Sequence, residues 1–159
     1  MSKAVLISIR PKWCQLIAIG EKTVEIRKTR PKLETPFRVY IYATKAAKYE
    51  PFSLCVQNSY DSACGKAYRY SGGGEVIGEF VCDRIEDIMI SCSDPDMRGI
   101  PFPGTGLTDR EIMDYLGNGK TGFSWHISNL KIYYKPKELS QFGMKRPTQS
   151  WCYVEEREE

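Results

Sequence analysis

The feature that most constrains this fold is residues 20–30, GEKTVEIRKTR, where a helical pattern gives way to an alternating one. Gly20 suits the left-handed position that ends a helix, and the alternation after it is typical of a β-strand. Side chains in a strand alternate with period two, so Val24 and Ile26 are predicted to face inward. Glu25 and Arg27 then share the opposite, exposed face.

Lys22 stands at the turn before this strand, and its long stem can swing toward the face of Glu25 and Arg27. Two interpretations of these charges follow from the residues alone. They form an ordinary exposed ion pair worth under about 1 kcal/mol, or they line a functional surface.

Short segments with alternating or helical apolar patterns follow along the rest of the chain. They favour a β-rich α+β fold with two or three helices. Pro11 begins a predicted helix that ends at Gly20, and Thr108 with Glu111 forms a capping box for a second helix. A glycine at 78 marks a predicted bulge. Strands are predicted at residues 4–9, 37–42, 75–85, 123–127, 130–134 and 151–154, a helix at 109–116, a helical turn at 136–142 and a loop at 91–106.

Length and composition limit the classes of protein to which the chain can belong. A chain of 159 residues with 42% hydrophobic residues is most simply one packed domain. We assign it to residues 1–154 and interpret residues 155–159 as a solvated acidic tail. No segment has the roughly 18 apolar residues of a membrane span, and no secretory signal is visible, so a cytoplasmic protein without membrane contact is predicted.

The six cysteines are therefore expected to be reduced thiols. None are spaced as Cys-x-x-Cys, and His126 is the only histidine, so neither a metal site nor another cofactor is predicted. His126 has two open roles, a hydrogen-bonded structural histidine or a member of the site.

Charge is distributed unevenly around a net value of +3. Residues 1–35 carry eight Lys or Arg against three Glu, and residues 117–150 carry six against one. Residues 81–116 reverse the balance, with eight acids against three bases. If the two basic segments meet in the fold, they form a surface that attracts phosphate.

The spacing Gly-x-Lys-x-x-Glu-x-Arg, made by Gly20, Lys22, Glu25 and Arg27, resembles the signature of the ASCH domain family. The preceding helix, the strand after the signature and residues 75–80 (EVIGEF) resemble the family's context as well. The resemblance implies a PUA-like fold, a small β-barrel with a cleft whose floor carries the signature, and a partner that is RNA or a modified nucleoside.

Several residues are then candidates for ligand binding. Trp125 and Trp151 are candidates for stacking on bases at a cleft rim, which would be worth about 1 to 3 kcal/mol per base. An ASCH-like arrangement also implies that Tyr42, Lys45 and Ser128 line the cleft. The full predicted set of ligand-binding residues is Arg27, Tyr42, Lys45, Trp125, His126, Ser128, Gln149, Ser150 and Trp151.

Some relatives in the wider family are hydrolases of modified nucleosides such as 4-acetylcytidine, and their signature reads Lys-x-x-Thr with a threonine nucleophile. Here Lys22 is kept, but Glu25 stands at the threonine position, and Thr23 lies roughly 7 Å away along the strand. If the chain is an enzyme, Glu25 is a general base or carboxylate nucleophile and Lys22 orients it. Three functions stay open: binding of RNA or a nucleotide, hydrolysis of a modified nucleoside or of RNA, and a protein-interaction module whose partner the sequence does not identify.

Overall fold

The strand β1 (Lys3–Ile9) is buried on both of its faces, and the remaining elements are arranged around it. Every side chain from Ala4 to Ile9 is at most 6% exposed, because alternate residues enter two different hydrophobic clusters. The computed structural model describes residues 2–45, 52–56, 66–70, 73–93 and 99–158.

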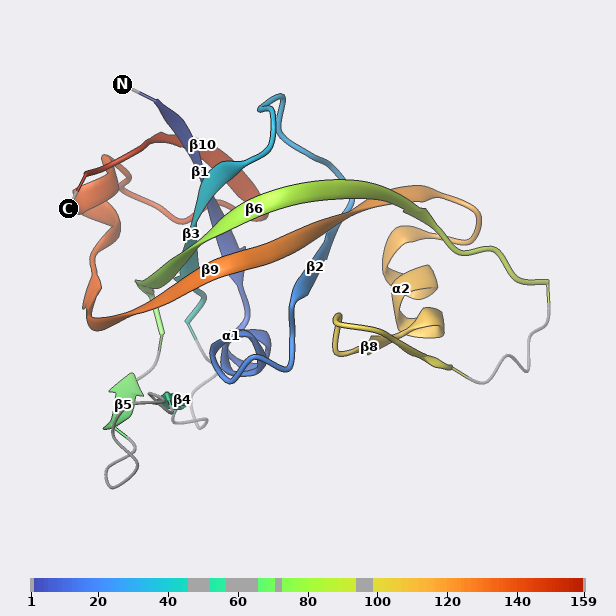
Figure 1. Cartoon of the computed structure of the whole chain (residues 1–159), viewed down its shortest axis with the longest axis horizontal. Helices are drawn as coiled ribbons and strands as arrows, with labels where there is room; N and C mark the ends of the chain where they lie inside the picture. Colours follow the sequence, from blue (N-terminus) through green and yellow to red (C-terminus); the bar gives the residue numbers. More distant parts are fainter. Residues whose placement is uncertain (1, 46–51, 57–65, 71–72, 94–98, 159) are drawn as a thin grey trace.

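One mixed sheet of six strands, in the order β10-β1-β3-β6-β9-β2, carries the fold (Figure 1). Only β1 and β3 pair in parallel, and the other neighbours are antiparallel. Its other strands are β2 (Val24–Arg27), β3 (Phe37–Ala43), β6 (Glu75–Met89), β9 (Thr121–Lys137) and β10 (Trp151–Glu155). Two short hairpins lie outside it: β4 (Phe52–Val56) with β5 (Lys66–Tyr70), and β7 (Pro101–Phe102) with β8 (Leu107–Thr108).

Helices α1 (Pro11–Ala18) and α2 (Asp109–Leu116) begin and end close to where the sequence predicts. Pro11 occupies the first turn of α1, and Gly20 follows the helix with φ +82°, the left-handed conformation expected of it. Thr108 and Glu111 form the predicted capping box of α2. The predicted helical turn after β9 is the 3₁₀ turn η1 (Leu139–Phe142).

The predicted strands at 123–127 and 130–134 are one continuous strand, β9. Asn129 has φ 48° there, and the β6–β9 register shifts between Glu79 and Val81, so a bulge replaces the predicted turn. The predicted bulge at Gly78 is confirmed, since the register with both neighbouring strands shifts beside it. The predicted loop at 91–106 contains β7, and residues 94–98 within it lie outside the described residues.

The predicted closed barrel is not confirmed. In the described part of the chain the sheet stays open, because its edge strands β2 and β10 do not pair with each other. What is established is a mostly β, α+β fold, with two α-helices among the residues that the structure describes.

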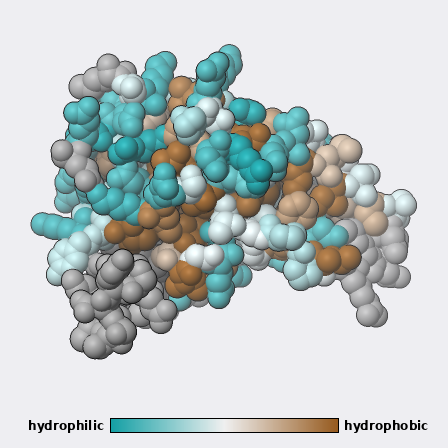
Figure 2. All heavy atoms as spheres, in the orientation of Figure 1, coloured by the Kyte–Doolittle hydropathy of each residue, from teal (hydrophilic) through white to brown (hydrophobic). Residues whose placement is uncertain are grey.

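Three hydrophobic clusters fill the space around the sheet. The largest lies between the sheet and α1, the second lies on the opposite face under η1, and the third joins β2 to α2. Figure 2 shows hydrophilic residues over the upper left of the molecule and hydrophobic ones around α2 at the right. In the described residues no helix is both long and apolar enough to cross a membrane.

The C-terminal residues are not simply a solvated tail. Glu155 is the last residue of β10, and Glu156 pairs with Arg38 Nε at 3.1 Å. The backbone nitrogen of Arg157 donates to the hydroxyl of Tyr40 at 2.9 Å. The start of the acidic segment is therefore held against β3.

Candidate functional site

The strand β2 carries the signature residues, and all four of its side chains are buried. Val24 and Ile26 pack against Ile112 and Leu116 of α2, as their apolar character predicts. Glu25 is only 7% exposed and Arg27 only 8%, so the prediction that their face is open to solvent is wrong. Their charged groups turn toward β1 and the residues that precede β10 and are covered there.

The ammonium group of Lys22 is 2% exposed and is held by oxygen atoms. Its Nζ donates to the carbonyl of Val24 at 2.9 Å and to that of Thr105 at 2.6 Å, and it lies 3.4 Å from Glu25 Oε2. The ring of Trp13 lies 5.3 Å from Nζ. Burial lowers the pKa of Lys22, and the charge of Glu25 opposes this shift.

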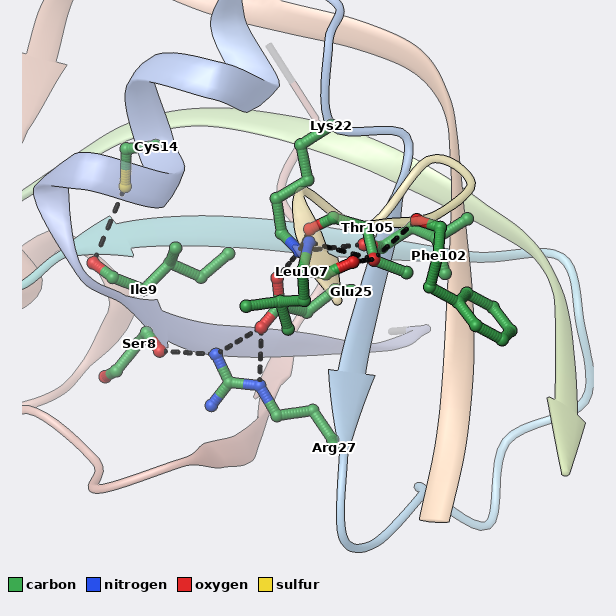
Figure 3. A network of polar contacts seen from close by, with 10 residues as sticks. Ser8, Ile9, Cys14, Lys22, Glu25, Arg27, Phe102, Thr105 and Leu107 are labelled. Carbon is green, nitrogen blue, oxygen red and sulfur yellow. Dashed lines mark hydrogen bonds and ion pairs between the residues drawn. The ribbon is translucent and has the colours of Figure 1, made fainter. Parts of the chain in front are cut away.

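The side chain of Arg27 reaches from β2 to β1, and Figure 3 shows its contacts with Glu25 and Ser8. Its Nε and Nη2 lie 3.1 and 3.0 Å from Glu25 Oε1, a two-point contact that fits a guanidinium. Nη2 also donates to the carbonyl of Ser8 at 2.8 Å, and Nη1 donates to Ser150 Oγ at 3.3 Å. Ser8 is the next-to-last residue of β1, and β10 begins only at Trp151, opposite Ile7, so Arg27 contacts β1 just beyond its pairing with β10.

Glu25 thus uses one carboxylate oxygen for Arg27. Its other oxygen, Oε2, is buried and has no hydrogen-bond partner in the described residues, although Lys22 Nζ is within ion-pair distance. A buried acceptor without a donor is uncommon and often marks functional chemistry.

The turn between β7 and β8 was not predicted to belong to the site. The carbonyl of Gly104 accepts from the backbone nitrogens of both Thr23 and Val24, at 2.8 and 2.9 Å. The adjacent Thr105 is fully buried and supplies the carbonyl that holds Lys22. The sequence signal was the pair Gly104 and Gly106, both with positive φ, inside a segment interpreted only as loop.

Cys14 of α1 also lies beside the network and was not predicted to do so (Figure 3). It is fully buried, and its Sγ lies 3.5 Å from the carbonyl of Ile9. Burial raises the pKa of its thiol, and the charge of Glu25 adds to this effect. Because the thiolate is the nucleophilic form, Cys14 is a core residue and not a nucleophile.

Three of the predicted ligand-binding residues lie next to Arg27. Ser150 is bonded to it, Gln149 is exposed beside Ser150, and Trp151 is half-buried, with its Nε1 donating to Thr29 Oγ1 at 2.9 Å. Trp125 has 0% exposure and packs between Phe37 and Trp151. Its predicted place at a cleft rim is wrong, because β9 turns it into the core.

The other predicted ligand-binding residues have no contact with Arg27 among the interactions of the described residues. His126 lies between Arg84, at 3.3 Å, and Glu86, at 3.0 Å, which is the structural, hydrogen-bonded role. Ser128 donates to the carbonyl of Val81. Tyr42 is buried in the cluster on the other face of the sheet, which raises its pKa, and Lys45 is exposed just beyond β3.

A groove of about 1200 Å³ lies elsewhere, where Arg38 meets Glu79 and the C-terminal residues. Arg38 forms ion pairs with the buried Glu79 at 2.9 Å and with Glu156. Its positive charge is therefore already neutralised by two carboxylates. None of the signature residues Lys22, Glu25 and Arg27 lines this groove. We take the signature as the candidate site because its charged side chains are buried. Among the described residues, no three His, Cys, Asp or Glu side chains gather as metal ligands.

Comparison with known proteins shows the family and the fold of the chain. A family model described as the ASCH domain matches residues 7–97. The crystal structure of ASCH from Zymomonas mobilis superposes with a TM-score of 0.62 at 18% identity, covering 96% of this chain and 87% of that one. A tyrosine-to-phenylalanine mutant of the same protein gives 0.63 at 19% identity, over 97% and 91%. No curated protein sequence matches the chain.

Proposed function

This chain belongs to the ASCH domain family, and from that premise we propose that it binds RNA or a nucleotide on the basic surface around Arg27. The resemblance that predicts this partner class rests on the signature, and the signature lies in the buried network described above. Gln149, Ser150 and Trp151 are the proposed ligand contacts beside it.

One observation carries the proposal: the two basic segments of the chain meet at Arg27. Arg27 and Ser8 come from the first segment and contact Ser150 and Thr148 of the second, with the Ser8 hydroxyl donating to the Thr148 carbonyl at 2.6 Å. Exposed cations of both segments flank these contacts, among them Arg10, Lys12, Lys28, Lys145 and Arg146. Positive charge gathered on one surface attracts phosphate.

The burial of the signature supports a positioning role for it in the proposed binding. Lys22, Glu25 and Arg27 contact one another and nearby carbonyls, so their charges are largely satisfied within the protein. They hold the segment around Ser150 in place, and the exposed cations supply the contacts to phosphate.

The test is the anisotropy of a labelled single-stranded RNA titrated with the protein at several salt concentrations. Each phosphate contact should lower the slope of log K against log salt by about 0.7. A peptide nucleic acid of the same base sequence, which carries no phosphate, is the matched control and should bind far more weakly. Equal binding of both, or affinity independent of salt, would favour the protein-interaction module over RNA binding.

A hydrolase is the second candidate, and the Glu25 oxygen that accepts no hydrogen bond favours it. Oε2 is buried, has no hydrogen-bond donor in the described residues and lies 3.4 Å from the Lys22 ammonium. In such a site Glu25 takes a proton from water, and Lys22 stabilises the negative charge that develops on the substrate.

Acylated cytidines and RNA are the substrates to test for turnover. The hydrolase proposal expects turnover by the parent and its loss in both Glu25→Gln and Lys22→Met, with circular dichroism showing that the fold is kept. Absence of turnover while Glu25→Gln still binds RNA would leave binding as the function.

A further inference from the structure

The segment from Lys28 to Lys32 follows the signature strand and presents a row of cations. Lys28, Arg30 and Lys32 are all exposed, whereas Pro31 between them is buried and fixes the backbone. Lys3 of β1 is exposed as well. Within the part of the chain that the structure describes, none of these four cations pairs with a carboxylate, so their charge is available to a partner.

Aromatic rings lie along the same segment. Lys28 Nζ is 5.1 Å from the ring of Tyr115, which is 42% exposed at the end of α2. At the other end, the hydroxyl of Tyr153 accepts from the backbone nitrogen of Lys32 at 2.8 Å, and its ring is 44% exposed. Since four residue steps span at most about 14 Å, one short segment connects both tyrosines.

Trp151 stands between these ends and is rigidly held. Its indole donates to Thr29, its ring meets Tyr153 edge-on at 5.3 Å, and it rests against the buried Trp125 at 5.9 Å. Lys3 Nζ lies 5.6 Å from the ring of Tyr153. Figure 1 shows the connection between β2 and β3 beside β10, where these contacts occur.

We propose that this surface, residues 28–32 with Lys3, Tyr115, Trp151 and Tyr153, is the track on which a single strand of RNA lies. The inference deepens the proposed function and rests on it. Unpaired bases stack on exposed aromatic rings, and the lysines that now lie over two of these rings move to the adjoining phosphates. Lysine on an exposed ring is weakly held, by about 0.5 to 1 kcal/mol, so a base displaces it.

Three acidic residues adjoin the track in sequence or in strand register, and one of them is already paired. Asp114 precedes Tyr115 but lies 3.9 Å from Arg110 in an ion pair. Glu34 is exposed on the same connection, and Glu155 pairs in register with Lys3 across the sheet. The three unpaired cations of 28–32 exceed these charges, so the segment attracts phosphate and does not repel it.

The experiment compares charge-matched variants in binding to a labelled ten-nucleotide oligouridylate. Lys28→Gln/Lys32→Gln and Lys131→Gln/Lys135→Gln each lower the net charge from +3 to +1. Lys131 and Lys135 are exposed on the far half of β9. We expect the first pair to lose about ten-fold or more in affinity and about 1.4 in salt slope, and the second pair to lose much less.

Stacking is tested separately with Tyr115→Leu against Tyr134→Leu, because Tyr134 is 76% exposed on β9. We expect Tyr115→Leu to lose about five-fold or more and Tyr134→Leu to bind like the parent. Unfolding temperatures confirm that each variant is folded. Equal losses in the matched variants would overturn the location while leaving RNA binding intact, whereas a parent that binds no RNA would overturn the proposed function with it.

Discussion

Arg27 connects β2 through its side chain to β1 and to the residue before β10, with which the backbone of β2 does not pair. It contacts Glu25, the Ser8 carbonyl and Ser150 while only 8% exposed. A buried charge with this many partners is costly to replace on one side only, since the remaining carboxylate keeps its desolvation cost and loses its counter-charge.

Arg27→Ala is therefore expected to lower the free energy of unfolding by about 3 to 5 kcal/mol. Arg27→Lys keeps the charge but not the two-point contact, so its free energy of unfolding should lie between those of Arg27→Ala and the parent. Urea denaturation measures both. Arg10→Ala, at an exposed residue with no side-chain cap bond, is the control and should change stability by under about 0.5 kcal/mol. A loss of less than about 1 kcal/mol in Arg27→Ala would mean that the sheet edges hold without it.

Cys82 makes stability depend on alkaline pH. Burial raises the pKa of its thiol from 9.0 to about 12, and Asp83 adds to the shift. The unfolded state then loses its proton first, so stability is complete below pH 9 and falls between pH 9 and 12. At pH 10.5 the loss is about 2 kcal/mol.

Cys82→Ala should be less stable than the parent at pH 8, by about 1 kcal/mol, because a buried sulfur is removed. At pH 10.5 the deficit should shrink or invert, because the variant has no thiol to ionise. Urea denaturation at both values gives the comparison, with Ser128→Ala, which removes no ionisable group, as the control. The same deficit at both values would contradict the raised pKa.

At the scale of elements, the β7–β8 hairpin is the part that covers the signature. Gly104 has φ +76°, and a Cβ there would lie 2.7 Å from Thr23 Oγ1. Gly143 has φ +72° but open space around it. Alanine at Gly143 introduces backbone strain alone, whereas alanine at Gly104 adds a steric clash.

Gly143→Ala should therefore cost about 1 kcal/mol and Gly104→Ala about 2 to 4 kcal/mol in the free energy of unfolding. Urea denaturation of the two variants and the parent in the same buffer measures both costs. Backbone nitrogens of Thr23 and Val24 should also exchange faster in Gly104→Ala, because they donate to the Gly104 carbonyl. Equal costs in the two variants would show that the hairpin moves away freely from β2.

Elements fixed by local chemistry could be predicted from the sequence. Pro11, Gly20 and the capping box of α2 each act within a few residues. The helices begin and end close to where these residues predict. The burial of Val24 and Ile26 followed from alternation. The continuity of β9 across Asn129 did not, because its pairing with the distant β6 overrides a local turn signal.

The site was only partly predictable for the same reason. Alternation places Glu25 and Arg27 on one face, but what covers that face comes from Ser8, Thr105 and Ser150, far away in sequence. The predicted rim position of Trp125 failed because period two does not tell which face of a strand is the core.

At the scale of the whole molecule, the six-stranded sheet is buried in one region and exposed in another. Strand β6 shows this within a single element. Residues Val76 to Phe80 are all buried between β3 and β9, whereas Met89 at its far end is 59% exposed. The far end pairs with β9 alone, because β3 begins at Phe37, opposite Cys82, and does not reach beyond that point.

Hydrogen exchange should therefore divide β6 into two parts, with β1 as the reference. Backbone amides of Val76–Phe80 should exchange as slowly as those of Leu6 and Ile7, through unfolding of the whole domain. Amides of Ile88 and Met89, which pair with Gly122 and Thr121 beyond the end of β2, should exchange many times faster, through local opening of this two-stranded end. Mass spectrometry of deuterated peptides resolves both parts in one sample, so the strand supplies its own control. Equal protection along β6 would show that its far end and α2 unfold only together with the rest of the molecule.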